Sequence, residues 1–148
     1  AQRMDGSPRQ LIDRLKSHPE TVLLGTNSFW EGVDIVGDAL SLLVITRLPF
    51  SVPSDPVFAA RSELFDDPFN AYAIPQAVLR FKQGFGRLIR SSTDRGVCVV
   101  LDRRTVSRRY GSSFVRSLPD CTVAVGPTSE LPARATEWLQ ARSASASV

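Results

Sequence analysis

Three polar residues in one stretch have the types and spacing to hold a polyphosphate: Gln83, Arg87 and Arg90. At about 100° per residue they gather on one side of a helix predicted over residues 74–90. Arginine presents a planar, permanently charged fork that suits phosphate oxygens, and the Gln83 amide can both donate and accept hydrogen bonds. An alternative stays open, because solvated helix faces often carry arginine.

The helix predicted to position these residues has an apolar side and two glycines. Pro75 is placed at its first residue, where a missing N–H costs nothing. The apolar side consists of Val78, Phe81, Phe85, Leu88 and Ile89. Gly84 and Gly86 each cost about 1 kcal/mol relative to alanine inside a helix. We therefore expect them to let a partner or ligand approach closely.

A second candidate site lies in the loop between two predicted strands, residues 21–25 and 41–46. Open α/β sheets bind their ligands at the ends of such strands. Gly32 permits a close approach of the backbone, and Glu31 and Asp34 have the chemistry to hold an arginine, a water or a metal-bound nucleotide. The alternative is an ordinary turn in which these carboxylates cap neighbouring N–H groups.

Composition favours one globular domain. The chain has 148 residues, 43% of them hydrophobic, and a net charge of +3. Its cations are 16 arginines and 2 lysines, and five arginines fall in one segment: Arg103, Arg104, Arg108, Arg109 and Arg116. Nucleic acid is therefore a plausible partner. We place Arg104 at a solvated helix start.

Membrane insertion and metal binding are not indicated by the sequence. No run of 18 apolar residues is present, and the first residue is not methionine, so we expect an excised piece of a longer protein. Cys98 and Cys121 sit inside apolar runs and are predicted to be small core hydrophobes in a reducing cytoplasm. His18, at a predicted helix end, is expected to be structural.

Alternating strands and helices predict an α/β fold with a parallel sheet. A capping box at residues 7–10 opens the first helix, which ends near residue 18, and Asp-Pro pairs at 55–56 and 67–68 open two short ones. Apolar runs without polar alternation predict strands buried on both faces at 21–25, 41–46, 96–102 and 121–125. Further helices are predicted over 106–118 and 131–139, and a disordered tail over 143–148.

Two segments together resemble motifs V and VI of superfamily 2 helicases, and most closely those of the DinG and XPD group. They are residues 28–34, Ser-Phe-Trp-Glu-Gly-Val-Asp, and residues 83–90, Gln-Gly-Phe-Gly-Arg-Leu-Ile-Arg. The connecting text is similar to bacterial DinG-type proteins at 48–50, 55–57, 91–96 and 108–111. The resemblance covers about residues 1–126. The second pattern is shared by many helicases, but its pairing with the first is specific to this group.

The resemblance implies the second RecA-like motor domain of an ATP-dependent DNA helicase. Such a domain closes over ATP and Mg²⁺, held mainly by the first motor domain, and couples hydrolysis to stepping along single-stranded DNA. It implies that Arg87 and Arg90 are arginine fingers and that Gln83 contacts the γ-phosphate region. The physics agrees, because phosphoryl transfer is catalysed chiefly by positioning and by neutralising charge.

The remaining site residues are also carried over from the resemblance. Glu31, Gly32, Asp34 and Gly86 would line the nucleotide cleft, and Ser28 and Trp30 would face the DNA. The implied fold is a three-layer, mostly parallel RecA-like sheet with helices on both faces, formed by residues 1–142. Its first strand and helix would precede Ala1, so the open sheet edge would allow weak self-association.

The departures from the family pattern keep other functions open. The chain has no phosphate-binding Gly-x-x-x-x-Gly-Lys loop and no Asp-Glu-Ala-His box, so it is expected to be inactive alone. It also lacks four cysteines for an iron–sulfur cluster, which the resemblance allows only in the full-length protein. A non-catalytic interaction module derived from the motor fold, and an unrelated flavodoxin-like domain, are the alternatives.

Overall fold

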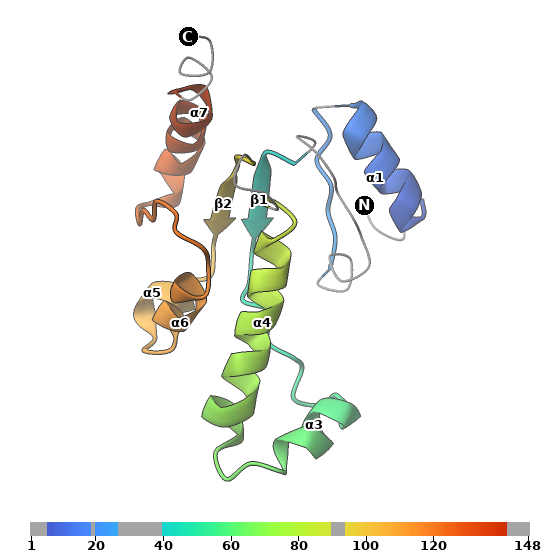
Figure 1. Ribbon diagram of the computed structural model, residues 1–148, viewed down its shortest axis with the longest axis vertical. Helices are drawn as coiled ribbons and strands as arrows, with labels where there is room; N and C mark the ends of the chain where they lie inside the picture. Colours follow the sequence, from blue (N-terminus) through green and yellow to red (C-terminus); the bar gives the residue numbers. More distant parts are fainter. Residues whose placement is uncertain (1–5, 19, 27–39, 90–93, 142–148) are drawn as a thin grey trace.

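The computed structural model describes residues 6–18, 20–26, 40–89 and 94–141 (Figure 1). Its elements in chain order are α1 (Pro8–Ser17), β1 (Leu42–Ile45), α3 (Pro56–Ser62), the π-helix η1 (Phe69–Ala73), α4 (Ile74–Phe85), β2 (Val97–Val100), α5 (Arg104–Ser107), α6 (Gly111–Arg116), the 3₁₀-helix η2 (Thr128–Glu130) and α7 (Leu131–Ala141). The predicted tail at 143–148 lies outside the described residues.

Helix α1 begins as the sequence predicts. The Ser7 hydroxyl accepts a hydrogen bond from the Gln10 N–H, and the Gln10 side chain accepts one from the Ser7 N–H, so the predicted capping box is confirmed. The helix ends at its cap His18. Its buried side chains Leu11, Ile12 and Leu15 form a small cluster of their own, and Leu23 packs against this cluster.

Strands β1 and β2 form a small parallel sheet, with Leu42 opposite Val97 and Ile45 opposite Val100. Parallel pairing is therefore confirmed, but burial on both faces is wrong. Leu42 and Val44 remain 43% and 46% exposed, because helices cover the face that carries Leu43 and Ile45. The fold observed is α/β with a two-stranded sheet among the described residues.

The strand predictions at 21–25 and 121–125 are wrong, because neither run joins the sheet in the structure. Val22 and Leu24 are 82% and 65% exposed, while Leu23 between them packs on α1. The side chains of residues 121–125 are also exposed. Apolar, β-branched sequence favours extended backbone, but a strand needs a neighbour with which to pair, and neither run has one in the described part.

Helix α4 is continuous with η1 and shorter than predicted. Pro75 is its second residue, and the turn before it is a π turn in which the Ile74 N–H bonds to the Phe69 carbonyl. A proline ring clashes with the carbonyl four residues earlier, and the wide turn gives it room. At the other end the helix stops at Phe85 with Gly86 as its cap, so the prediction of a helix up to residue 90 is wrong.

Residues 104–116 form two helices instead of the single helix predicted over 106–118. The chain is extended at Arg108, and α6 then begins at Gly111. Gly111 packs directly on the backbone oxygens of Arg104 and Thr105, at a place where a Cβ atom would collide with them. This close packing folds α6 back against α5.

The main core lies between the sheet, α4 and α6 (Figure 1). Its most buried large side chains, Phe81 of α4 and Phe114 of α6, meet edge to face with their centroids 5.5 Å apart. Phe50, in the loop after β1, packs on Phe114 and Tyr110 as well. Burying these rings fixes the side of α4 that faces the protein.

Asp102, just beyond β2, links three parts of the chain. Its carboxylate accepts hydrogen bonds from the Leu48 N–H at 2.8 Å and from the Arg104 guanidinium at 2.6 Å. Arg104 in turn lies over the Phe50 ring, 5.2 Å from its centroid. Arg104 starts α5 as predicted and its side chain is 40% exposed, but its guanidinium is bound to Asp102 and does not face solvent alone. Hydrogen bonding to Arg104 holds the pKa of Asp102 well below its usual range.

We predict that Gly111→Ala destabilises the protein by about 2 kcal/mol or more, because the new methyl group must displace backbone oxygens. Gly86→Ala is the control, since a Cβ atom there meets its nearest neighbour, the Lys82 oxygen, at 3.4 Å. The control should be neutral or slightly stabilising. Urea unfolding of both variants measures the difference, and equal stabilities would contradict the packing described.

We predict that Asp102→Asn costs about 2 kcal/mol at pH 7, the scale of hydrogen bonds to charged groups, moderated because the Arg104 side chain is 40% exposed. Because the pKa of Asp102 is lower in the folded protein than its unfolded-state value of 3.8, the ionised carboxylate stabilises the fold above pH 3.8. This contribution to the free energy of unfolding is lost as the pH falls below that value. The gap between wild type and variant should therefore be constant above about pH 5 and shrink below about pH 4.

The control for this prediction is Asp120→Asn, which removes an exposed carboxylate in the chain that follows α6. Chemical unfolding followed from pH 7 down to pH 3 should leave this variant parallel to wild type. A gap for Asp102→Asn that stays constant through acid would show that its carboxylate is not held by Arg104.

Candidate functional site

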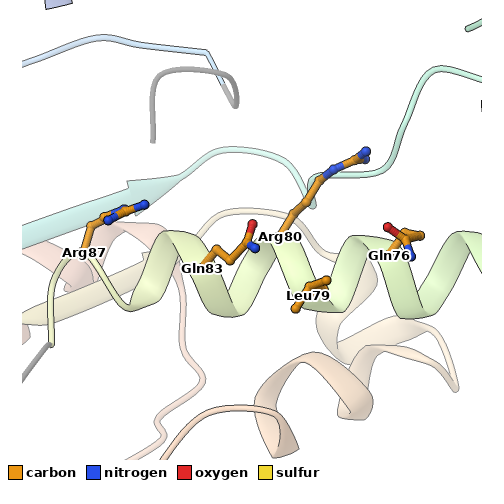
Figure 2. A pocket seen from close by; sticks show the side chains of 5 residues that line it. All are labelled: Gln76, Leu79, Arg80, Gln83 and Arg87. Atoms are coloured by element: carbon orange, nitrogen blue, oxygen red, sulfur yellow. The ribbon is translucent and has the colours of Figure 1, made fainter. Parts of the chain in front are cut away.

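One side of α4 carries a polar hollow of about 350 Å³, lined by Gln76, Leu79, Arg80, Gln83 and Arg87 (Figure 2). We call these residues the α4 stripe. Four of them are polar and follow one another at intervals of four, three and four residues, which places them on one helix face. Gln83 and Arg87, both predicted from the sequence, are thus brought together.

Packing of the opposite side of α4 aims the stripe outward. Ala77, Phe81 and Phe85 are buried against the protein, and this arrangement leaves Gln83 exposed and Arg87 partly exposed. Arg87 lies beyond the last helical residue, in a tightened turn where its N–H bonds to the Gly84 carbonyl at 3.1 Å. Burial of Leu88 in the same turn fixes its course.

Sequence reasoning missed Gln76 and Arg80. The helical period that selected Gln83 and Arg87 also selects them, because Arg80 lies one turn before Gln83 and Gln76 lies two turns before it. Arg80 donates a hydrogen bond from Nη1 to the Ser51 hydroxyl. In Figure 2 its side chain extends from α4 toward the loop that follows β1. The described stripe therefore brings two guanidinium groups and two amides to one face, a combination suited to an anion with several oxygens.

Several predicted site residues lie outside the described residues, so their positions relative to the stripe stay predictions. They are Ser28, Trp30, Glu31, Gly32, Asp34 and Arg90. Gly86 is described, and this chain leaves ordinary van der Waals room for a Cβ atom there. Gly84 is buried, so the expectation that a ligand approaches its backbone is wrong.

A second hollow, of about 400 Å³, lies where β1 and β2 end. It is lined by Thr46, Arg47, Leu101, Asp102, Arg103 and Arg104. The arginine-rich segment noted in the sequence supplies two of these residues. Arg47 was not singled out, because it stands alone in its part of the sequence and only the pairing of β1 with β2 brings it to Arg103.

The described histidine, cysteine and carboxylate side chains form no group of metal-binding size, and the two cysteines differ in burial. Within residues 6–141, gaps aside, no three His, Cys, Asp or Glu side chains gather to hold a metal ion. Burial raises the pKa of the Cys98 thiol to about 12, so it stays protonated and unreactive. Cys121 is exposed, so its prediction as a core residue is wrong. No described helix is long and apolar enough to cross a membrane.

Comparison of the sequence with known proteins shows the family to which the chain belongs. Residues 1–121 match the model of the helicase C-terminal domain. The chain is 49% identical over 118 residues to the ATP-dependent DNA helicase YoaA of Haemophilus influenzae, covering 77% of this chain and 18% of the relative. It is 46% identical over 132 residues to the 3'-5' exonuclease DinG of Bacillus subtilis, covering 86% of this chain and 14% of the relative.

A third relative is the ATP-dependent helicase DinG of Mycobacterium tuberculosis, 42% identical over 119 residues, or 78% of this chain and 18% of the relative. The chain thus spans less than a fifth of the length of these relatives. The resemblance drawn from the two sequence motifs is confirmed. Because the family model covers most of the 148 residues, the chain belongs to the helicase C-terminal domain family, within its DinG-like group.

Proposed function

We propose that this chain is the second RecA-like motor domain of an ATP-dependent DNA helicase, in which the α4 stripe faces the nucleotide. The observation that carries the proposal is that Gln83 and Arg87 line one hollow on an outward side of α4, in a chain of the helicase C-terminal domain family. In the complete motor, residues 1–142 belong to a three-layer fold, a mostly parallel sheet with helices on both faces.

The proposed role of the stripe is to stabilise charge during phosphoryl transfer. Arg87 and Arg90 act as arginine fingers, and Gln83 orients groups around the γ-phosphate. Positively charged, preorganised donors suit this task because the transition state carries its charge on the phosphoryl oxygens. The hydrogen bond from Arg80 to Ser51 helps to keep its guanidinium aligned with the same face.

Triphosphate and Mg²⁺ would be held mainly by the first motor domain, where the ion would neutralise phosphate charge. The described residues of this chain offer no cluster of carboxylates for the ion. Glu31, Gly32, Asp34 and Gly86 would complete the cleft from the loop before β1 and the turn after α4. Ser28 and Trp30 would contact single-stranded DNA. With two cysteines, this chain cannot itself hold a four-cysteine iron–sulfur cluster.

We predict that Arg87→Ala or Arg90→Ala, in the helicase polypeptide that contains this domain, lowers DNA-stimulated ATP turnover by about 10³-fold or more. Nucleotide affinity should fall much less, because a finger acts on charge that develops in the transition state. Arg87→Lys should not restore turnover, since a flexible point charge cannot reproduce the planar fork. Steady-state ATPase with saturating single-stranded DNA measures these effects.

The matched control is Arg14→Ala, which removes an exposed arginine on α1 and should leave turnover unchanged. Residues 1–148 alone should hydrolyse no ATP. Near-normal turnover of Arg87→Ala would remove the finger assignment and favour the non-catalytic interaction module. ATP hydrolysis by the isolated chain would contradict the division of labour between two motor domains.

We also predict weak, concentration-dependent self-association of residues 1–148. In the described part β1 and β2 pair only with each other, and unpaired edge groups invite another strand. Val44→Lys, which puts a charge on the exposed face of β1, should reduce the association. Sedimentation over a hundredfold range of concentration tests this, and a clean monomer throughout would refute it.

A further inference from the structure

The hollow at the ends of β1 and β2 is separate from the α4 stripe and shares no lining residue with it. Because the strands are parallel, both carboxyl ends reach the same edge of the sheet. Arg47 follows the end of β1 by two residues, and Arg103 follows the end of β2 by three. This is the edge where open α/β sheets place ligands.

The exposed charge of this hollow is positive. Its one acidic lining residue, Asp102, has a side chain only 8% exposed. The Asp102 carboxylate accepts from the Leu48 N–H and from the Arg104 backbone and guanidinium, so its charge is balanced inside the protein. Arg47 and Arg103 are both exposed. An anion reaching the hollow therefore meets two arginines and the partly exposed Arg104, without a competing exposed carboxylate in the lining.

The backbone that carries these arginines is held in place. Arg47 precedes Leu48, which is buried and anchored through its N–H to Asp102. Arg103 lies between Asp102 and Arg104, which bond to each other. The spacing of the two exposed arginines is thus set by one carboxylate, so less entropy is lost when they bind a ligand.

We propose that Arg47 and Arg103 bind backbone phosphates of a nucleic-acid strand that passes across the carboxyl edge of β1 and β2. This inference rests on the proposed helicase function and adds to it a strand-binding site distinct from Ser28 and Trp30. Arg108 and Arg109, exposed within about one turn of the end of α5, supply further cations for the same strand.

The lining favours a strand over a free nucleotide. Nucleotide and other small-molecule sites are concave and mostly apolar, with walls that enclose the base. This hollow has no aromatic residue in its lining, and Leu101 is its one apolar side chain. Arginines without base-stacking groups bind phosphates of any sequence. The site should therefore be indifferent to base identity.

The test is the affinity of residues 1–148 for fluorescein-labelled dT20 and dA20, measured by anisotropy without nucleotide between 25 and 200 mM KCl. The double variant Arg47→Ala/Arg103→Ala should bind both oligonucleotides at least 10-fold more weakly at low salt. Its log K against log salt should be less steep by about 1.4, or 0.7 for each phosphate that the variant no longer neutralises. Arg47→Lys/Arg103→Lys should keep most of the wild-type slope.

The matched control is Arg9→Ala/Arg14→Ala, which removes the same charge from the exposed side of α1 and should change affinity less than twofold. Arg87→Ala should leave oligonucleotide binding intact. The ATPase assay therefore tests the finger assignment, and the anisotropy measurement tests the strand-binding site separately. Circular dichroism melting curves that match wild type establish that each variant is folded.

The following outcomes would overturn the inference. They are absence of oligonucleotide binding by the wild-type chain, unchanged binding by Arg47→Ala/Arg103→Ala, an equal loss in the α1 control, and displacement of the oligonucleotide by millimolar ATP in wild type but not in Arg87→Ala. The last result would assign binding to the α4 stripe. A strong preference for dT20 or dA20 that disappears in the double variant would also contradict a phosphate site.

Discussion

Burial of the apolar side of α4 is the constraint on which the rest of this structure depends. Ala77 and Phe81 are almost completely buried against Ile45 and Phe114, at the centre of the main core. Removing these side chains from water leaves α4 one orientation on the sheet. The polar stripe then has to point away from the core, so the hydrophobic effect determines where Gln83 and Arg87 are presented.

The loop between β1 and α3 connects the two polar hollows. The N–H of Leu48 bonds to Asp102 at the edge hollow, and the hydroxyl of Ser51, three residues later, accepts from Arg80 in the α4 stripe. Phe50, between them, packs beneath Arg104 and against Phe114. Two arginine-lined surfaces are thus tied to one short segment that is itself anchored in the core. Under the two proposals above, this segment would link the surface that faces the nucleotide to the surface that faces the strand.

The arginines that line the hollow at the ends of β1 and β2 fall into two physical classes. Arg104 forms an ion pair with Asp102 and lies over the Phe50 ring, so its charge stabilises the fold. Arg47 and Arg103 are exposed, so their charge faces solvent. Net charge alone does not separate these classes, because a guanidinium bound to a carboxylate and one facing solvent count equally in a sum. The local ion pairs determine which cations a polyanion meets.

The sequence by itself determined how two helices begin, and it indicated the family. The capping box at Ser7 and the Asp55 cap of α3 follow from neighbouring residues, and the alternation of strands with helices predicted that β1 and β2 are parallel. Only the tertiary structure showed that Arg104 is bound to Asp102, that Arg47 and Arg103 line one hollow, and that the runs at 21–25 and 121–125 join no described strand. Such features depend on contacts between residues far apart in the chain, whereas periodicity reports only which face of an element is apolar.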